Sequence, residues 1–107
     1  MRRILFICSE NRLRSPTAEA IFSEMEGIEA LSAGTNKDAE TPLTGDLIEW
    51  ADVILVMESS HRQKVAKKYQ PLLKDKKLAS LAIPDHYEFM DPELVRVLKA
   101  KVPRYIE

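Results

Sequence analysis

The sequence contains a single cysteine, Cys8, among its 107 residues. One thiol cannot form a disulfide within the chain, which excludes the disulfide-stabilised scaffold of small secreted domains. No Cys/His cluster has the spacing of a zinc site, so we expect neither a metal nor another cofactor. The longest apolar runs are about five residues, too short for a signal-peptide core and far below the roughly 20 residues that cross a bilayer. We therefore expect a cytoplasmic protein without a membrane partner.

The chain also lacks an excess of charge of either sign, with 16 Lys and Arg against 17 Asp and Glu. A broad nucleic-acid surface would need a basic excess, so we expect no nucleic-acid partner. A lysine-rich stretch at residues 64–77 alternates with acidic and apolar residues and predicts a solvated face. No repeat, low-complexity segment or Gly/Ser-rich linker is present, and a hydrophobic fraction of 45% suffices for one core. These features predict a single domain over residues 1–107.

Short apolar runs are present instead, and they favour buried strands. Continuous rather than alternating hydrophobicity is typical of strands that are covered on both faces, as in a parallel sheet. The expected strands span residues 4–7, 29–32, 53–57 and 78–83. The expected helices span residues 15–26, 44–50, about 60–73 with a break near Pro71, and 92–102. Ser15 and Asp91 are predicted as N-caps, each followed by a proline at the first helical position.

The strand–helix unit thus occurs four times in succession. Right-handed crossovers convert such a chain into a flavodoxin-like, doubly wound α/β fold with helices on both faces of the sheet. We expect four parallel strands in the order 2-1-3-4. In such sheets the functional crevice lies at the carboxyl ends of the strands, where the winding reverses. The loop after the first strand is therefore the first place to look for a site.

That loop reads CSENRLRSP from Cys8 to Pro16. Backbone N–H groups of a loop that opens a helix converge with the helix N-terminus on an anion site. The same positive field stabilises a thiolate, which predicts that Cys8 is nucleophilic at neutral pH rather than an inert buried thiol. Arg14 can donate two hydrogen bonds to phosphate oxygens and stabilise the charge that spreads over them during transfer. The loop therefore predicts phosphoryl-transfer chemistry.

The sequence resembles the low-molecular-weight protein tyrosine phosphatase family, and most closely a short branch of predicted tyrosine phosphatases. The resemblance is carried by residues 4–8, Asn11, residues 14–19 and 32–35, and later by residues 51–57 and 83–87. It implies a phosphocysteine intermediate on Cys8, phosphate binding by Arg14 and the loop amides, and no metal.

The resemblance also implies roles for individual side chains. Asp85, which matches the aspartate after Ile-Pro in the family pattern, would be the general acid, and Ser15 would hydrogen-bond the thiolate. Asn11, in a left-handed conformation, and Ser32 would brace the loop. The expected catalytic residues are Cys8, Arg14 and Asp85. The expected substrate-binding residues are Ser9, Glu10, Asn11, Arg12, Leu13, Ser15 and Tyr87.

The chain departs from the family pattern in length and in the loop. It is some tens of residues shorter than typical members, mainly between Gly34 and Ala51, a region that often shapes the substrate wall. Glu10 stands where a glycine is usual, and Arg12 where a small or apolar residue is usual. Two interpretations stay open for this pair: an exposed ion pair across the lip of the loop, or contacts with substrate, in which Arg12 would favour acidic groups near the phosphate.

Residues outside the loop have alternative interpretations. Asp91 is the rival acid, but its place before Pro92 favours helix capping. His61 begins a polar helix and is expected to be solvated. The strand-end segment that contains Glu58 shows no feature that requires chemistry.

Together these observations predict a metal-independent phosphomonoester hydrolase with a cysteine nucleophile, most simply a protein tyrosine phosphatase. Its partners would be a phosphotyrosine-containing protein or a small aryl phosphate, with phosphate, sulfate or vanadate as active-site anions. A phosphoryl-carrier domain phosphorylated on Cys8 is one alternative, although it would not need Arg14 or Asp85. An arsenate reductase that relies on an external thiol is another, and a third is a module that holds anions without turnover.

Overall fold

The computed structural model describes residues 1–106, in which strands and helices alternate. The strands are β1 (Arg2–Cys8), β2 (Ile28–Gly34), β3 (Val53–Val56) and β4 (Lys77–Ser80). The helices are α1 (Arg14–Phe22), α2 (Gly45–Trp50), α3 (Ser59–Tyr69), α4 (Pro92–Lys101) and α5 (Pro103–Ile106), and a 3-10 turn (Gln70–Leu72) follows α3. No helix within the described residues is long and apolar enough to cross a membrane.

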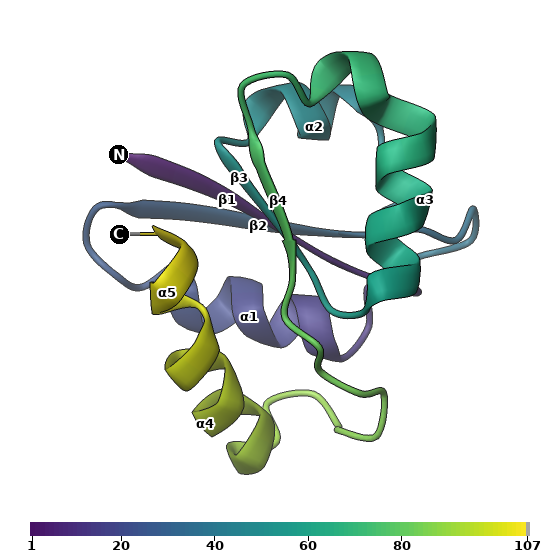
Figure 1. Ribbon diagram of the computed structural model, residues 1–107. Helices are drawn as coiled ribbons and strands as arrows, with labels where there is room; N and C mark the ends of the chain where they lie inside the picture. The colour runs from purple at the N-terminus through teal and green to yellow at the C-terminus, as the bar shows by residue number, and fades with distance from the viewer. Residues whose placement is uncertain (107) are drawn as a thin grey trace.

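The four strands form one parallel sheet in the order β2-β1-β3-β4. Helices α1, α4 and α5 cover one face of this sheet, and α2 and α3 cover the other (Figure 1). The predicted doubly wound, flavodoxin-like α/β fold is therefore confirmed. The winding reverses between β1 and β3, so the carboxyl ends of these two strands border the functional crevice of the fold.

The two central strands, β1 and β3, contain the longest buried runs. Successive side chains of a strand point to opposite faces, so β1 supplies two separate apolar layers. Phe6 belongs to the layer under α1 and α4 and stacks on Phe22 with the ring centroids 5.6 Å apart. Leu5 belongs to the layer under α2 and α3, together with Ile48. The apolar runs at residues 4–7 and 53–57 thus correspond to strands that are buried on both faces, as predicted, whereas the edge strand β4 is only partly buried.

The beginning of α1 differs from the prediction. The first helical residue is Arg14 and the N-cap is Leu13, whose side chain makes no capping hydrogen bond. Ser15 is therefore inside the first turn rather than at the cap, and Pro16 is the third helical residue. The hydroxyl of Ser15 is directed to Cys8 instead of to the helix backbone, so the site overrides the local capping preference.

The end of α1 also differs, because the helix stops at Phe22 rather than near Glu26. The chain then turns into β2 through Gly27, whose φ of 83° is a left-handed conformation that glycine adopts without steric cost. Met25 consequently lies in this turn and is 37% exposed, instead of extending the buried stripe of the helix.

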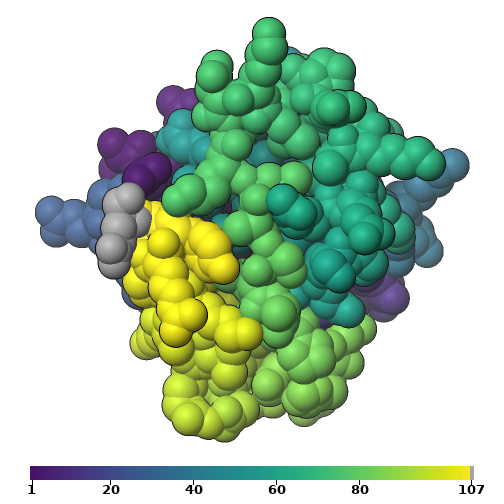
Figure 2. All heavy atoms as spheres, in the orientation of Figure 1, coloured from purple at the N-terminus to yellow at the C-terminus, as the bar shows by residue number. Residues whose placement is uncertain are grey.

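The segment after β4 carries the chain toward the carboxyl end of the sheet. Regular strand structure ends at Ser80, but Leu81 and Ile83 still donate backbone hydrogen bonds to β3 and its extension, to Val56 and Met57. This part of the chain is visible at the surface between α3 and the C-terminal helices (Figure 2). It ends at Ile83, whose carbonyl oxygen accepts a hydrogen bond from Arg14, and the loop that follows contains Asp85. Helix α4 then begins as predicted, with Asp91 as its N-cap and a proline at its first position.

Candidate active site

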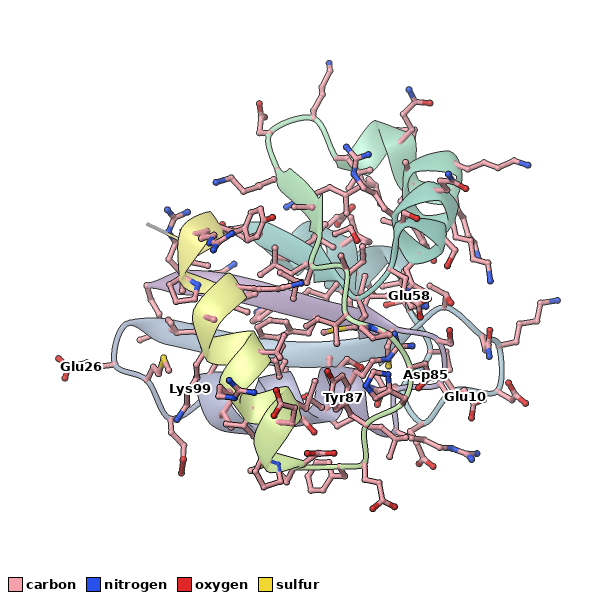
Figure 3. All side chains as sticks on the ribbon, turned by 60° about the horizontal axis from the view of Figure 1, so that its bottom comes forward. Glu10, Glu26, Glu58, Asp85, Tyr87 and Lys99 are labelled. Atoms are coloured by element: carbon pink, nitrogen blue, oxygen red, sulfur yellow. The ribbon has the colours of Figure 1, made fainter. Side chains whose placement is uncertain are left out.

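A pocket of about 340 Å³ lies at the carboxyl end of β1. It is lined by the residues Cys8, Ser9, Glu10, Arg12, Leu13, Arg14 and Asp85. All three predicted catalytic residues therefore line one pocket, although Asp85 is far from the other two in the sequence. Figure 3 shows Glu10, Glu58 and Asp85 gathered at this end of the sheet, while Glu26 lies at the opposite end. The volume is sufficient for a small ligand such as a phosphate ester.

The loop between β1 and α1 is held in shape by the end of β2. Asn11 has a φ of 57°, the left-handed conformation implied by the family resemblance. Gly34 is required for the close approach of β2, because a Cβ at this position would lie 2.6 Å from the Ser9 carbonyl oxygen and 3.1 Å from the Asn11 nitrogen. Here glycine is needed for space rather than for a positive φ.

The carbonyl and N–H groups of this loop are used differently. The carbonyl oxygens of Cys8, Ser9 and Glu10 accept hydrogen bonds from the backbone N–H groups of the segment after β2. Within residues 1–106, the N–H groups at positions 9–14 have no hydrogen-bond acceptor. Unpaired N–H groups in a loop that leads into a helix N-terminus form an anion-binding arrangement. The loop can therefore bind a phosphoryl group through its backbone.

A hydrogen-bond chain beneath the loop ends at the Cys8 sulfur. The Asn11 amide donates one N–H to Ser32 Oγ at 2.9 Å and another to Ser15 Oγ at 3.0 Å. Ser32 in turn donates to the Glu19 carboxylate at 2.5 Å. Ser15 Oγ lies 2.9 Å from Cys8 Sγ, and because this oxygen already accepts from Asn11, its own proton can be donated to the sulfur. A thiolate at Cys8 would thus receive a hydrogen bond.

Arg14 is almost completely buried, with 2% of its surface exposed. Its Nη1 donates to a carboxylate oxygen of Glu58 at 2.5 Å and to the Ile83 carbonyl oxygen at 2.8 Å. Its Nε lies 3.7 Å from the carboxylate of Asp85. These contacts fix the guanidinium plane at the pocket that Arg14 lines. Glu58, for which the sequence suggested no chemistry, therefore positions a pocket residue.

His61 is buried rather than solvated, contrary to the sequence-based expectation, and is only 2% exposed. It lies at the third position of α3, where it forms a reciprocal capping box with Glu58. Its Nε2 is 2.8 Å from Ser9 Oγ, at the edge of the pocket. Burial and the nearby Arg14 guanidinium lower the pKa of His61, against an opposing effect of the Glu58 carboxylate. The three-residue spacing of Glu58 and His61, which is that of a capping box, is a sequence signal for the contact between these two residues but not for the contact with Ser9.

Some predicted substrate-binding residues do not line the pocket. Asn11 and Ser15 are buried beneath the loop, where they brace it. Tyr87 packs against the core and its ring centroid lies 4.2 Å from that of His86. Tyr87 is not among the residues that line the pocket, and its place in the substrate slot stays a prediction. The other expected residues, Ser9, Glu10, Arg12 and Leu13, do line the pocket.

The lip of the pocket is formed by charged side chains. Arg12 makes ion pairs with Glu10 and with Glu40, each at 3.5 Å, and all three side chains are more than half exposed. The ion-pair interpretation therefore describes this structure, with Glu40 as an additional partner. Two carboxylates against one guanidinium leave the lip with a net negative charge.

Comparison with known proteins connects this geometry to a family. A sequence model described as "Low molecular weight phosphotyrosine protein phosphatase" matches residues 3–49. The chain is 33% identical to a protein-arginine-phosphatase of Bacillus subtilis (strain 168), with 62% of each chain covered. It is 31% identical to a protein-arginine-phosphatase of Geobacillus stearothermophilus, with 69% of this chain and 66% of that protein covered. The chain therefore spans less than two thirds of the length of these curated relatives.

The fold extends the likeness over the whole chain. The low molecular weight protein tyrosine phosphatase of Streptococcus pyogenes superposes with a TM-score of 0.80, at 16% identity, over 100% of this chain and 95% of the other. At that identity the superposition shows the shared fold alone. The sequence match over residues 3–49 shows that this chain belongs to the low molecular weight protein tyrosine phosphatase family.

Proposed function

We propose that this protein is a cysteine-dependent phosphatase that removes phosphoryl groups from protein side chains. The observation that carries the proposal is the position of Cys8, Arg14 and Asp85 around one pocket, above a loop with unpaired N–H groups. The family membership supports the same chemistry.

In the first step, the phosphoryl group binds to the loop N–H groups and to the guanidinium of Arg14. Cys8 Sγ attacks phosphorus, the S–P bond forms, and the bond from phosphorus to the leaving atom breaks. Asp85 donates its proton to that leaving atom. The Arg14 guanidinium, already oriented by Glu58, stabilises the charge that spreads over the phosphoryl oxygens.

In the second step, the Asp85 carboxylate takes a proton from a water molecule that attacks phosphocysteine. The P–S bond breaks, inorganic phosphate leaves, and Cys8 returns as a thiolate that accepts the hydrogen bond of Ser15. Asp85 therefore alternates between general acid and general base, as microscopic reversibility requires.

Two substrate classes have specific support. The family description and the resemblance of the loop favour phosphotyrosine. The names of the two curated relatives favour phosphoarginine, and the net negative lip formed by Glu10, Arg12 and Glu40 would attract a cationic guanidinium group. The deciding experiment is a comparison of kcat/KM for phosphotyrosine and phosphoarginine in the same peptide sequence. A higher value for one substrate assigns the class.

The activity itself is tested by phosphate release from an aryl phosphate in the presence of a chelator. We expect the wild type to complete many turnovers and Cys8→Ser to release no phosphate above background. A wild-type protein that becomes phosphorylated once but releases no phosphate would be a carrier domain. Equal turnover by Cys8→Ser would show that Cys8 is not the nucleophile.

A further inference from the structure

The side chain of His61 makes two hydrogen bonds at the border of the pocket, and together they determine where its proton lies. Nδ1 lies 3.1 Å from the backbone nitrogen of Glu58 and accepts its hydrogen. Nε2 lies 2.8 Å from Ser9 Oγ. A backbone N–H can only donate, so Nδ1 must present a lone pair. The neutral imidazole therefore carries its proton on Nε2 and donates it to the Ser9 hydroxyl.

This contact in turn fixes the direction of the Ser9 hydroxyl. A hydroxyl group has one proton and two lone pairs, and in Ser9 one lone pair is taken by His61. Ser9 lines the pocket beside Cys8, and no other partner of its Oγ is found within residues 1–106. Its proton therefore remains available for an acceptor that enters the pocket.

We propose that His61 is a positioning residue, which orients the Ser9 hydroxyl as a hydrogen-bond donor to an oxygen of the substrate phosphoryl group. The inference rests on the proposed function, because it concerns the same anion site. It adds one side-chain donor, held from α3, to the backbone donors of the loop. It also explains why His61 is buried although most of its helix, α3, is polar.

The arrangement requires a neutral His61. Four charged side chains surround the ring: Arg14 from α1, Lys64 from α3, Glu58 at the N-terminus of α3, and Asp85 from the loop after β4. Burial and the two cations favour the neutral form and lower the pKa of His61, while the two carboxylates oppose them. Protonation would place a hydrogen on Nδ1 against the Glu58 N–H, so the hydrogen-bond pair is lost in acid.

A matched pair of substitutions separates this role from helix capping. In His61→Gln the amide nitrogen reaches the position of Nε2 and can still donate to Ser9, but the acceptor for the Glu58 N–H is lost. In His61→Asn the amide oxygen replaces Nδ1 and preserves the cap, but nothing reaches Ser9. The measurement is the Kd of inorganic phosphate, determined by calorimetry. It is made for the wild type, both His61 variants, Ser9→Ala and the double variant Ser9→Ala/His61→Asn. For the same proteins, kcat and KM are measured with an aryl phosphate.

We expect Ser9→Ala and His61→Asn each to weaken phosphate binding by about tenfold or more, the range for a hydrogen bond to a charged group. His61→Gln should stay within about threefold of the wild type, and the double variant should bind no worse than Ser9→Ala, because the two residues act in series. Wild-type affinity in His61→Asn or in Ser9→Ala would overturn the proposal. So would a loss in the double variant equal to the product of the two single losses.

Three further outcomes are also decisive. If His61→Gln does not fold, the Ser9→Ala, His61→Asn and double-variant affinities decide the question alone. If the wild type binds no phosphate at all, the proposed function itself is wrong. A wild type that binds phosphate and is unaffected by Ser9→Ala retains the proposed function and loses only this inference.

Discussion

At the scale of single residues, the site is defined by the direction of its hydrogen bonds. The carboxylate of Glu19 can only accept, which orients Ser32, and the Asn11 amide then donates to both Ser32 and Ser15. The hydrogen-bond chain ends at the Ser15 hydroxyl, which lies 2.9 Å from Cys8 Sγ and 3.4 Å from the Ala33 carbonyl oxygen and can donate its proton to the nearer sulfur. A thiolate at Cys8 would therefore receive a hydrogen bond from a neutral donor.

The general acid can be assigned by a leaving-group comparison. Asp85→Asn should slow phenyl phosphate by about 10²–10⁴-fold, the loss typical of acid–base catalysis. It should slow an ester of a much more acidic phenol distinctly less, because that phenolate departs without a proton. Asp91→Asn is the matched control, since Asp91 caps α4 through the Glu93 N–H at 2.9 Å and asparagine also caps well. If Asp91→Asn shows the leaving-group-dependent loss instead, the roles must be exchanged.

The orientation of Arg14 depends on Glu58, and this dependence is measurable. Glu58→Gln removes the negative charge that holds Nη1 at 2.5 Å, so we expect kcat/KM to fall by about tenfold or more as a charge-assisted hydrogen bond is weakened. Arg14→Lys should lose more, about 10²-fold, because a lysine cannot make the bidentate contact. Glu26→Gln, at the opposite end of the molecule (Figure 3), is the control and should leave kcat/KM unchanged. Unchanged activity in Glu58→Gln would mean that the Ile83 carbonyl alone positions the guanidinium.

At the scale of secondary-structure elements, the sequence predicted what depends on local patterns. Apolar runs located β1 and β3, and the Asp91-Pro92 pair located the beginning of α4. The beginning of α1 was missed because the hydroxyl of Ser15, a good capping group, is directed to Cys8 instead. His61 was missed because its burial depends on a contact with Ser9, 52 positions away, and no local pattern contains that contact.

The element that shapes the loop most directly is the end of β2. Gly34→Ala would place a Cβ 2.6 Å from both the Ser9 carbonyl oxygen and the Ala39 side chain. Because backbone cannot yield as a flexible side chain does, we expect the loop to move and phosphate affinity to fall by about tenfold or more, a loss similar to that of one charged hydrogen bond. Gly45→Ala is the control, since its Cβ would meet only side-chain atoms, the nearest at 3.3 Å. Wild-type phosphate binding in Gly34→Ala, measured by calorimetry, would contradict this account of the loop.

At the scale of the whole molecule, His61 connects the site to the stability of the fold. Its pKa is lowered in the folded state, so the unfolded chain binds a proton first as the pH falls. The contribution of His61 to the free energy of unfolding should therefore be fully present above the ordinary histidine pKa of about 6.5. It should be lost progressively as the pH falls below that value. The free energy of unfolding is measured with urea between about pH 5 and pH 8, the interval in which histidine changes its charge. It should decrease toward low pH in the wild type and decrease less in His61→Asn. His86→Asn, at the exposed second histidine, should behave like the wild type; a decrease that is the same in all three proteins would refute the assignment to His61.

The central claim is that Cys8 carries the phosphoryl group during turnover, and acid quenching of the reaction tests it most directly. We predict that mass spectrometry of the quenched wild type finds one added phosphoryl group on the peptide that contains Cys8. Asp85→Asn should accumulate more of this phosphorylated peptide when the phenol is a good leaving group. The phosphorylated peptide should decay at the rate at which phosphate is released. Two results would contradict this claim. One is phosphate release by the wild type with no phosphorylated Cys8 peptide at any time, and the other is phosphate release at an undiminished rate by Cys8→Ser.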